Sequence, residues 1–222
     1  MKDKETIIVG VASGIAAYKT LDLIKLLKKD GASVFVVMTK NAMAMVPVLE
    51  FEKVSGNKVY SDLFEKEFDY QKILKLRKVD HIDLADKADV IVIAPATANI
   101  IAKIAHGIAD DFLTTMILAT TAPVIICPSM NVHMWQNPLV QENITKLKNL
   151  GYHIIEPEEG ELACGYEGKG RLAHIQTIRN EVIRHLKYRN SLVGKKIIVT
   201  AGGTFEKIDD VRFLTNKSSG KM

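Results

Sequence analysis

Cysteine is scarce in this sequence, whose 222 residues include only Cys127 and Cys164. A small secreted scaffold held by several disulfides is therefore excluded. The sequence also lacks an apolar run long enough to cross a bilayer, and its first residues, MKDKE, are charged where a secretory leader would become hydrophobic. We expect a cytoplasmic protein with no membrane partner.

A strong charge of one sign is also missing. Thirty Lys and Arg residues face 26 Asp and Glu, which leaves a net charge of +4 spread along the chain. Nucleic-acid binding would need basic residues gathered in blocks, so we expect no nucleic-acid partner. We also expect no metal site.

The glycine pattern of dinucleotide binding is absent. The first glycine loop, residues 10–14, does not have the GxGxxG spacing, and no acidic residue stands at 36–38, where the second strand ends. A mononucleotide therefore fits this loop better than NAD.

Short apolar runs alternate with stretches of helical period, and 47% of the residues are hydrophobic. The runs lie at 6–11, 33–38, 90–94, 123–127 and 153–155, and the helical stretches at 15–29, 97–106, 109–120 and 136–150. This alternation predicts an α/β fold, a Rossmann-like (flavodoxin-like) parallel sheet with helices on both faces.

A closing helix is expected at 174–190, so that residues 1–190 form one domain. Residues 194–204 then predict a further strand and glycine loop, which cannot bury a core by themselves. We interpret 191–222 as a linker and the incomplete start of a second domain.

Ligands of such sheets bind beyond the carboxyl ends of the strands. The loop at Ser13 and Gly14 opens a helix and suits a phosphate, although a tight turn capped by Ser13 would look the same. Small residues at 95–99 would let a flat ring approach the backbone. The alternative interpretation of this loop is that Thr97 serves only as a helix N-cap. Residues 128–135 gather two methionines, a tryptophan and Asn131, which indicates a ligand pocket or a core-packing loop.

Three further residues stand out. His81 alone is typical of a structural or solvated histidine. Cys164 lies in a glycine-rich segment, 161–171, that looks like a flap able to bring a thiol to a substrate. Cys127, inside an apolar run, is interpreted as a small buried hydrophobe.

Five segments together resemble the flavin-containing cysteine decarboxylases, most closely those that act on phosphopantothenoylcysteine. They are GVASGIAAYK (10–19), VDHIDLA (79–85), APATANIIAKIAHGIAD (94–110), PSMNVHMW (128–135) and LACGYEGKGRL (162–172). The tail from residue 201 resembles the opening of a CTP-dependent phosphopantothenate–cysteine ligase domain. It breaks off early, so ligase activity is not expected from this chain.

The resemblance implies a lyase of coenzyme A biosynthesis that uses FMN. The substrate would be 4'-phosphopantothenoylcysteine and the product 4'-phosphopantetheine, formed through a thioaldehyde and then an enethiolate. The resemblance assigns proton transfer and positioning to His81, substrate binding to Asn131 and protonation of the enethiolate to Cys164. It also implies a homotrimer with flavin at the subunit contacts, and a larger assembly in a full-length form.

The resemblance further implies two sets of binding residues. Those for the cofactor are Ser13, Gly14, Ile15, Thr39, Pro95, Ala96, Thr97, Asn99, Ala109 and Asp110. Those for the substrate are Met130, Asn131, Gly165 and Arg171. Asp111 departs from the family, which usually has Asn there, and its charge would weaken flavin binding if it pointed inward.

Alternatives remain open at this stage. A peptidyl-cysteine decarboxylase or a prenyl transferase would share the fold, but the ligase-like tail argues against both. A non-catalytic flavin-binding regulator is disfavoured because His81, Asn131 and Cys164 are all present. An empty Rossmann-like domain would not explain five motif segments.

Overall fold

The computed structural model describes residues 4–63, 79–162, 165–188, 194–200 and 202–217. The chain divides into two units, Met1–Arg189 and Asn190–Met222. None of the helices in the described ranges combines the length and the apolar character that a bilayer crossing requires.

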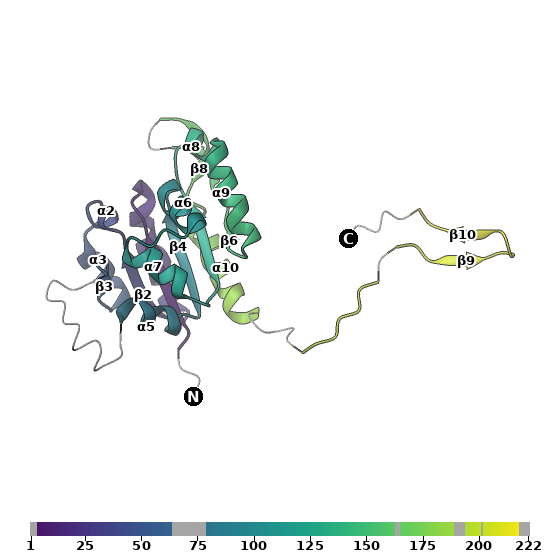
Figure 1. Ribbon diagram of the computed structural model, residues 1–222, viewed down its shortest axis with the longest axis horizontal. Coiled ribbons are helices and arrows are strands. Elements are labelled where there is room, and N and C mark those ends of the chain that lie inside the picture. Colours follow the sequence, from purple (N-terminus) through teal and green to yellow (C-terminus); the bar gives the residue numbers. More distant parts are fainter. Residues whose placement is uncertain (1–3, 64–78, 163–164, 189–193, 201, 218–222) are drawn as a thin grey trace. The chain divides into compact units, whose positions relative to one another are not determined.

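The first unit is built on a six-stranded sheet in the order β3-β2-β1-β4-β5-β6, with every neighbouring pair parallel (Figure 1). The strands are β1 (Thr6–Val11), β2 (Ser33–Met38), β3 (Val59–Tyr60), β4 (Val90–Ala96), β5 (Val124–Pro128) and β6 (His153–Ile154). This is the strand order of the Rossmann fold, with its switch point between β1 and β4. The predicted fold class is confirmed.

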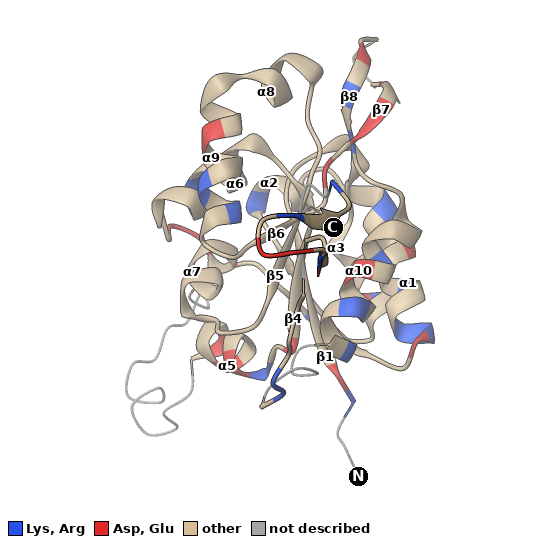
Figure 2. Cartoon of the chain, turned by 90° about the vertical axis from the view of Figure 1, so that its right-hand side faces the viewer, with Lys and Arg blue, Asp and Glu red and all other residues tan. Residues whose placement is uncertain are grey.

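Helices cover both faces of the sheet. They are α1 (Thr20–Lys29), α2 (Lys40–Met43), α3 (Val48–Ser55), α5 (Asp80–Lys87), α6 (Ala98–His106), α7 (Phe112–Ala119), α8 (Val132–Gln136), α9 (Pro138–Asn149) and α10 (Ile175–Tyr188). Figure 2 shows α1 and α10 on one side of the sheet and α5, α6, α7 and α9 on the other.

Each strand contributes to both halves of the core because successive side chains point to opposite faces. In β1, Ile8 joins the cluster under α5, α6 and α7, whereas Ile7 and Val9 join the cluster under α1 and α10. All three side chains are fully buried. A strand buried on both faces must be apolar throughout, which is why the sequence runs were continuous rather than alternating.

Several local expectations need correction. The stretch 15–29 begins as a 3₁₀ helix, Ile15–Lys19, before α1, and its N-cap is Gly14 with no side-chain cap among the described residues, so Ser13 does not cap it. The helices α2 and α3 and the strand β3 were not predicted. They form the long connection after β2, where Thr39 and Pro47 begin the two short helices.

The flap segment is a β-hairpin of β7 (Glu158–Glu161) and β8 (Glu167–Arg171), which pair antiparallel. Residues 163 and 164 lie outside the described ranges.

The second unit contains a hairpin of β9 (Phe205–Lys207) and β10 (Phe213–Thr215). The strand expected within 194–204 is not found in the described part of that segment. A strand requires a paired neighbour, and the described residues of this unit pair only with one another in the hairpin.

Candidate functional site

The switch point of the sheet brings two loops together. Beyond β1 the backbone N–H of Ala12 donates to the carbonyl oxygen of Pro95, at 3.2 Å, which ties the first glycine loop to the end of β4. Gly14 also lies against this strand, where a Cβ would make an ordinary contact of 3.4 Å with Cγ of Pro95. The loop is therefore held against the place where the fold class predicts a ligand.

A polar cavity of about 460 Å³ opens beside these loops. It contains the expected cofactor residues Ser13, Thr39, Thr97, Asn99 and Asp110. Its remaining lining residues are Ala12, Lys40, Asn41, Ser61, Asp62, Leu63, Ile100, Lys103 and Asp111. Hydroxyl, amide and ammonium groups from the ends of several strands thus face one space.

The charged groups of this cavity are paired with one another. Nζ of Lys40 lies 3.2 Å from Asp62, and Nζ of Lys103 bonds both carboxylate oxygens of Asp110, at 2.6 and 2.8 Å. The hydrogen bond raises the pKa of Lys103 and lowers the pKa of Asp110. Because each lysine is paired with a carboxylate, the hydroxyl groups and backbone amides are the donors left for an anion bound here.

Asp111 lines the same cavity, yet its carboxylate is engaged by the protein. It caps α7, accepting hydrogen bonds from the backbone N–H and the hydroxyl of Thr114, each at 2.8 Å, and it lies 3.4 Å from Nζ of Lys103. A carboxylate at a helix N-terminus is stabilised by the helix dipole. The unusual acid at this position therefore has a structural role as well as a place beside the cavity.

A second cavity, of about 320 Å³, adjoins the first and shares Ser13 and Thr97 with it. Its lining includes the expected residues Gly14, Ile15, Met130 and Asn131, together with Ala16, Ala98, Ser129, Met134, Leu162 and Gly170. Methionine and aliphatic side chains dominate this list. The two cavities therefore form one site with a polar part and an apolar part, which meet at the ends of β1 and β4.

Asn131 is fixed by the local fold. It is the N-cap of α8, and its side-chain oxygen accepts the backbone N–H of His133 at 2.8 Å. The neighbouring N–H of Met130 donates to the carbonyl of Gly170 at 3.0 Å and so docks the flap hairpin on this loop. A Cβ at residue 170 would overlap the carbonyl oxygen of Met130, so only glycine permits the contact.

Residues 1–187 match the Flavoprotein family, and residues 192–222 match the DNA/pantothenate metabolism flavoprotein C-terminal domain. The chain belongs to the Flavoprotein family. A relative from Bacillus subtilis, the coenzyme A biosynthesis bifunctional protein CoaBC, is 48% identical over 224 residues, which are 100% of this chain and 53% of the relative. The chain thus spans about half the length of the curated relatives it matches.

Two solved structures share the fold of this flavoprotein. The FMN-dependent cysteine decarboxylase SpaF has a TM-score of 0.68 at 33% identity, covering 82% of this chain and 97% of its own. A mutant PPC decarboxylase complexed with pantothenoylaminoethenethiol has a TM-score of 0.72 at 31% identity, covering 83% of this chain and 99% of its own.

His81 is placed differently from Asn131, the other expected catalytic residue of the flavoprotein that the structure describes. It belongs to α5, and it is not among the residues that line the two cavities. Its ring packs edge-on against Phe112, with centroids 5.9 Å apart, and its Nδ1 is buried with no partner in the described part of the chain. Burial lowers the pKa of His81.

Other expected residues lie beside the cavities without lining them. Pro95 and Ala96 are buried in β4, where the Ala94–Pro95 peptide is cis. Ala109, Gly165 and Arg171 are likewise absent from both linings, and Arg171 pairs with Glu158 across the flap hairpin. Cys164 lies outside the described residues. Cys127 is fully buried, as predicted, and burial raises the pKa of its thiol.

Sequence reasoning missed several lining residues of the polar cavity. Lys40 and Asn41 follow Thr39 at the carboxyl end of β2, and applying the strand-end rule to that loop would have found them. Lys103 is one helical turn beyond Asn99 on α6, so helical spacing predicts that both face the same way.

Proposed function

We propose that this flavoprotein uses FMN to decarboxylate 4'-phosphopantothenoylcysteine to 4'-phosphopantetheine in coenzyme A biosynthesis. The observation that carries the proposal is the pair of adjoining cavities that meet at Ser13 and Thr97. Together they offer polar groups for a phosphate and a polyol, and apolar surface for a ring and a thiol-bearing chain. The names of the relatives and structural neighbours support the same reaction.

The residues present fit an FMN. The hydroxyl of Ser13 and the backbone amides of Gly14 and Ile15 would hold the phosphate, at a helix start that no described side chain caps. Thr39, Asn99 and Thr97 offer hydroxyl and amide groups to the rest of the cofactor. When bound, the flavin supplies the oxidation that creates an electron sink next to the carboxylate, and the later reduction of the product.

The chain's own residues bind the substrate and move its protons. Asn131 would hold the substrate carboxylate or amide, with its orientation set by the cap it makes to His133. His81 would position the substrate and transfer a proton before or at loss of carbon dioxide. Cys164 would protonate the enethiolate, with Met130, Gly165 and Arg171 contributing to substrate binding around the flap.

We further propose that the protein acts as a cytoplasmic homotrimer in which His81 serves the cavity of a neighbouring copy. Its absence from the cavities of its own chain supports this arrangement. The helices α5 and α7, which pack on each other, also expose Ile82 by 40% and Leu118 by 53%. Exposed apolar side chains on these two helices are suited to an interface between copies.

The Asn131→Asp variant tests the proposal. Aspartate keeps the acceptor that caps α8, so the fold and flavin binding should survive, but a second carboxylate against that of the substrate should abolish decarboxylation. Flavin content is read from the visible absorption spectrum and product from mass spectrometry after mixing with 4'-phosphopantothenoylcysteine. A colourless wild-type protein that binds no FMN in titration contradicts the cofactor, and wild-type turnover by the variant contradicts the role of Asn131.

A further inference from the structure

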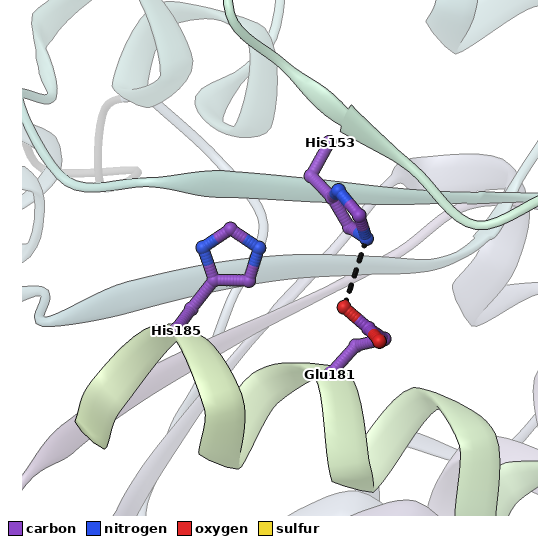
Figure 3. Close-up of side chains that lie close together, drawn as sticks. All are labelled: His153, Glu181 and His185. Atoms are coloured by element: carbon purple, nitrogen blue, oxygen red, sulfur yellow. Dashed lines mark ion pairs between the residues drawn. The ribbon is translucent and has the colours of Figure 1, made fainter. Parts of the chain in front are cut away.

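A cluster of metal-binding side chains lies outside the two cavities. His153 projects from β6, whereas Glu181 and His185 stand one turn apart on α10 and point toward it (Figure 3). All three residues are half-buried, and their ligand atoms lie within 4.8 Å of one another. The set offers two imidazole nitrogens and one carboxylate oxygen.

The spacing of these atoms is close to that of a zinc site. Zinc ligands stand about 2.0–2.1 Å from the ion, which places tetrahedral ligand atoms roughly 3.3 Å apart. Nε2 of His153 and Oε2 of Glu181 are already 3.1 Å apart. The ligand atom of His185 lies no more than 4.8 Å from the other two, so a side-chain rotation that shortens these distances by up to about 1.5 Å completes the third ligand.

His185 provides a second observation. Its Nε2 is buried and makes no hydrogen bond with any residue that the structure describes. A buried polar atom without a partner is unfavourable unless something satisfies it. Two imidazoles and one carboxylate, with a fourth position left for water, are a donor set that zinc uses in proteins.

We propose that His153, Glu181 and His185 bind one divalent transition-metal ion, of which zinc is the best match. The ion joins the edge strand β6 to the last helix of the first unit. It therefore stabilises the fold at a place separate from the flavin cavities, and the inference does not depend on the proposed reaction.

Arg184 competes with the ion. Its Nη2 and Nε lie 2.6 and 2.9 Å from the same Oε2 of Glu181 that a metal would use. The Arg184 side chain is 53% exposed and can turn into solvent when the ion binds. Removing its positive charge should make the site bind zinc more tightly. In an ordinary ion-pair network without a metal, Arg184→Gln would only remove one ion pair, so this variant distinguishes the two interpretations.

The experiment titrates Zn²⁺ against a competing chromophoric chelator in the purified full chain. The wild type should bind one equivalent, and His153→Gln, Glu181→Gln and His185→Gln should each weaken binding by at least about tenfold, because each removes a ligand. Arg184→Gln should bind more tightly. The matched control is His174→Gln, whose histidine also approaches a carboxylate, Glu158, at 3.4 Å but lies outside the cluster.

Thermal unfolding provides a second readout. At a free zinc concentration a hundred times the wild-type Kd, the melting temperature should rise by about 5–10 °C in the wild type and in His174→Gln, and by about half as much or less in the three ligand variants. A far-ultraviolet circular dichroism spectrum like that of the wild type shows that each variant is folded. The proposal is overturned if the wild type binds no zinc, if the ligand variants bind it as the wild type does, or if His174→Gln loses it too.

Discussion

The position of His81 predicts that two inactive variants restore each other's activity. If His81 acts in the cavity of a neighbouring copy, His81→Asn and Asn131→Asp damage different parts of each shared site. A mixed assembly then contains some sites in which a cavity with intact Asn131 meets a neighbour with intact His81. The absence of His81 from the linings of the two cavities of its own chain is the structural basis of this expectation.

The size of the effect follows from counting. In a ring of identical contacts assembled at random from equal amounts of both variants, the cavity belongs to a His81→Asn copy half of the time. Its neighbour is an Asn131→Asp copy half of the time, so about a quarter of the sites should be intact. The unfractionated mixture should therefore regain about a quarter of wild-type turnover, and trimers that carry both variants, each with one intact site in three, should reach about a third.

The assay co-expresses the two variants with different affinity tags and purifies assemblies that carry both. The control pairs Asn131→Asp with Ser13→Asp, two changes in the same cavity, so that every copy has a damaged cavity and no activity should return. If mixed assemblies of His81→Asn and Asn131→Asp carry flavin yet stay inactive, His81 does not act across copies, and the reasoning fails.

Three further predictions concern stability, each measured by urea denaturation. Asp111→Asn should change the free energy of unfolding little because it keeps the cap of α7, whereas Asp111→Ala should lose about 1 kcal/mol. Cys127→Ser should cost about 1–3 kcal/mol by burying a hydroxyl in an apolar strand, without changing the flavin stoichiometry of the folded protein. Because burial lowers the pKa of His81 below 6.5, the unfolded chain binds more protons, so stability should fall as pH drops from about 7 to 5. His81→Asn should flatten that fall, with His106→Gln as the control. If the free energy of unfolding of His81→Asn falls with pH as steeply as that of the control, His81 is not the group responsible.

The bounds of the central strands could be predicted closely because a short continuous apolar run between helical stretches indicates a strand buried on both faces. The runs at 6–11 and 33–38 match β1 and β2 at both ends, since strands buried on both faces tolerate only apolar residues. The strand β3 has two residues, both half-buried, and such a short edge strand leaves no period to detect. The helix α2 has four residues and depends on the cap that Thr39 makes to Ala42.

Those parts of the site that depend only on strand order could also be predicted. Ser13, Thr97 and Asn131 each follow a central strand, and in a parallel sheet the loops that follow the strands all lie at their carboxyl ends. The position of His81 relative to these loops could not be predicted because it depends on how α5 packs. The cluster at His153 was missed because an edge strand and a distant helix supply its ligands, with no short motif to connect them.

At Thr97 the sequence left two roles open, a helix cap and a ligand contact. In this fold one residue can have both. A helix that follows a parallel strand begins at the carboxyl edge of the sheet, where the ligand also binds. Thr97 accepts the backbone N–H of Ile100 with its hydroxyl oxygen and also lines both cavities. Accepting that bond uses a lone pair, whereas the hydroxyl proton is a separate donor. The cap therefore fixes the side chain in the orientation from which it faces the site, and the same reasoning applies to Asn131 at the start of α8.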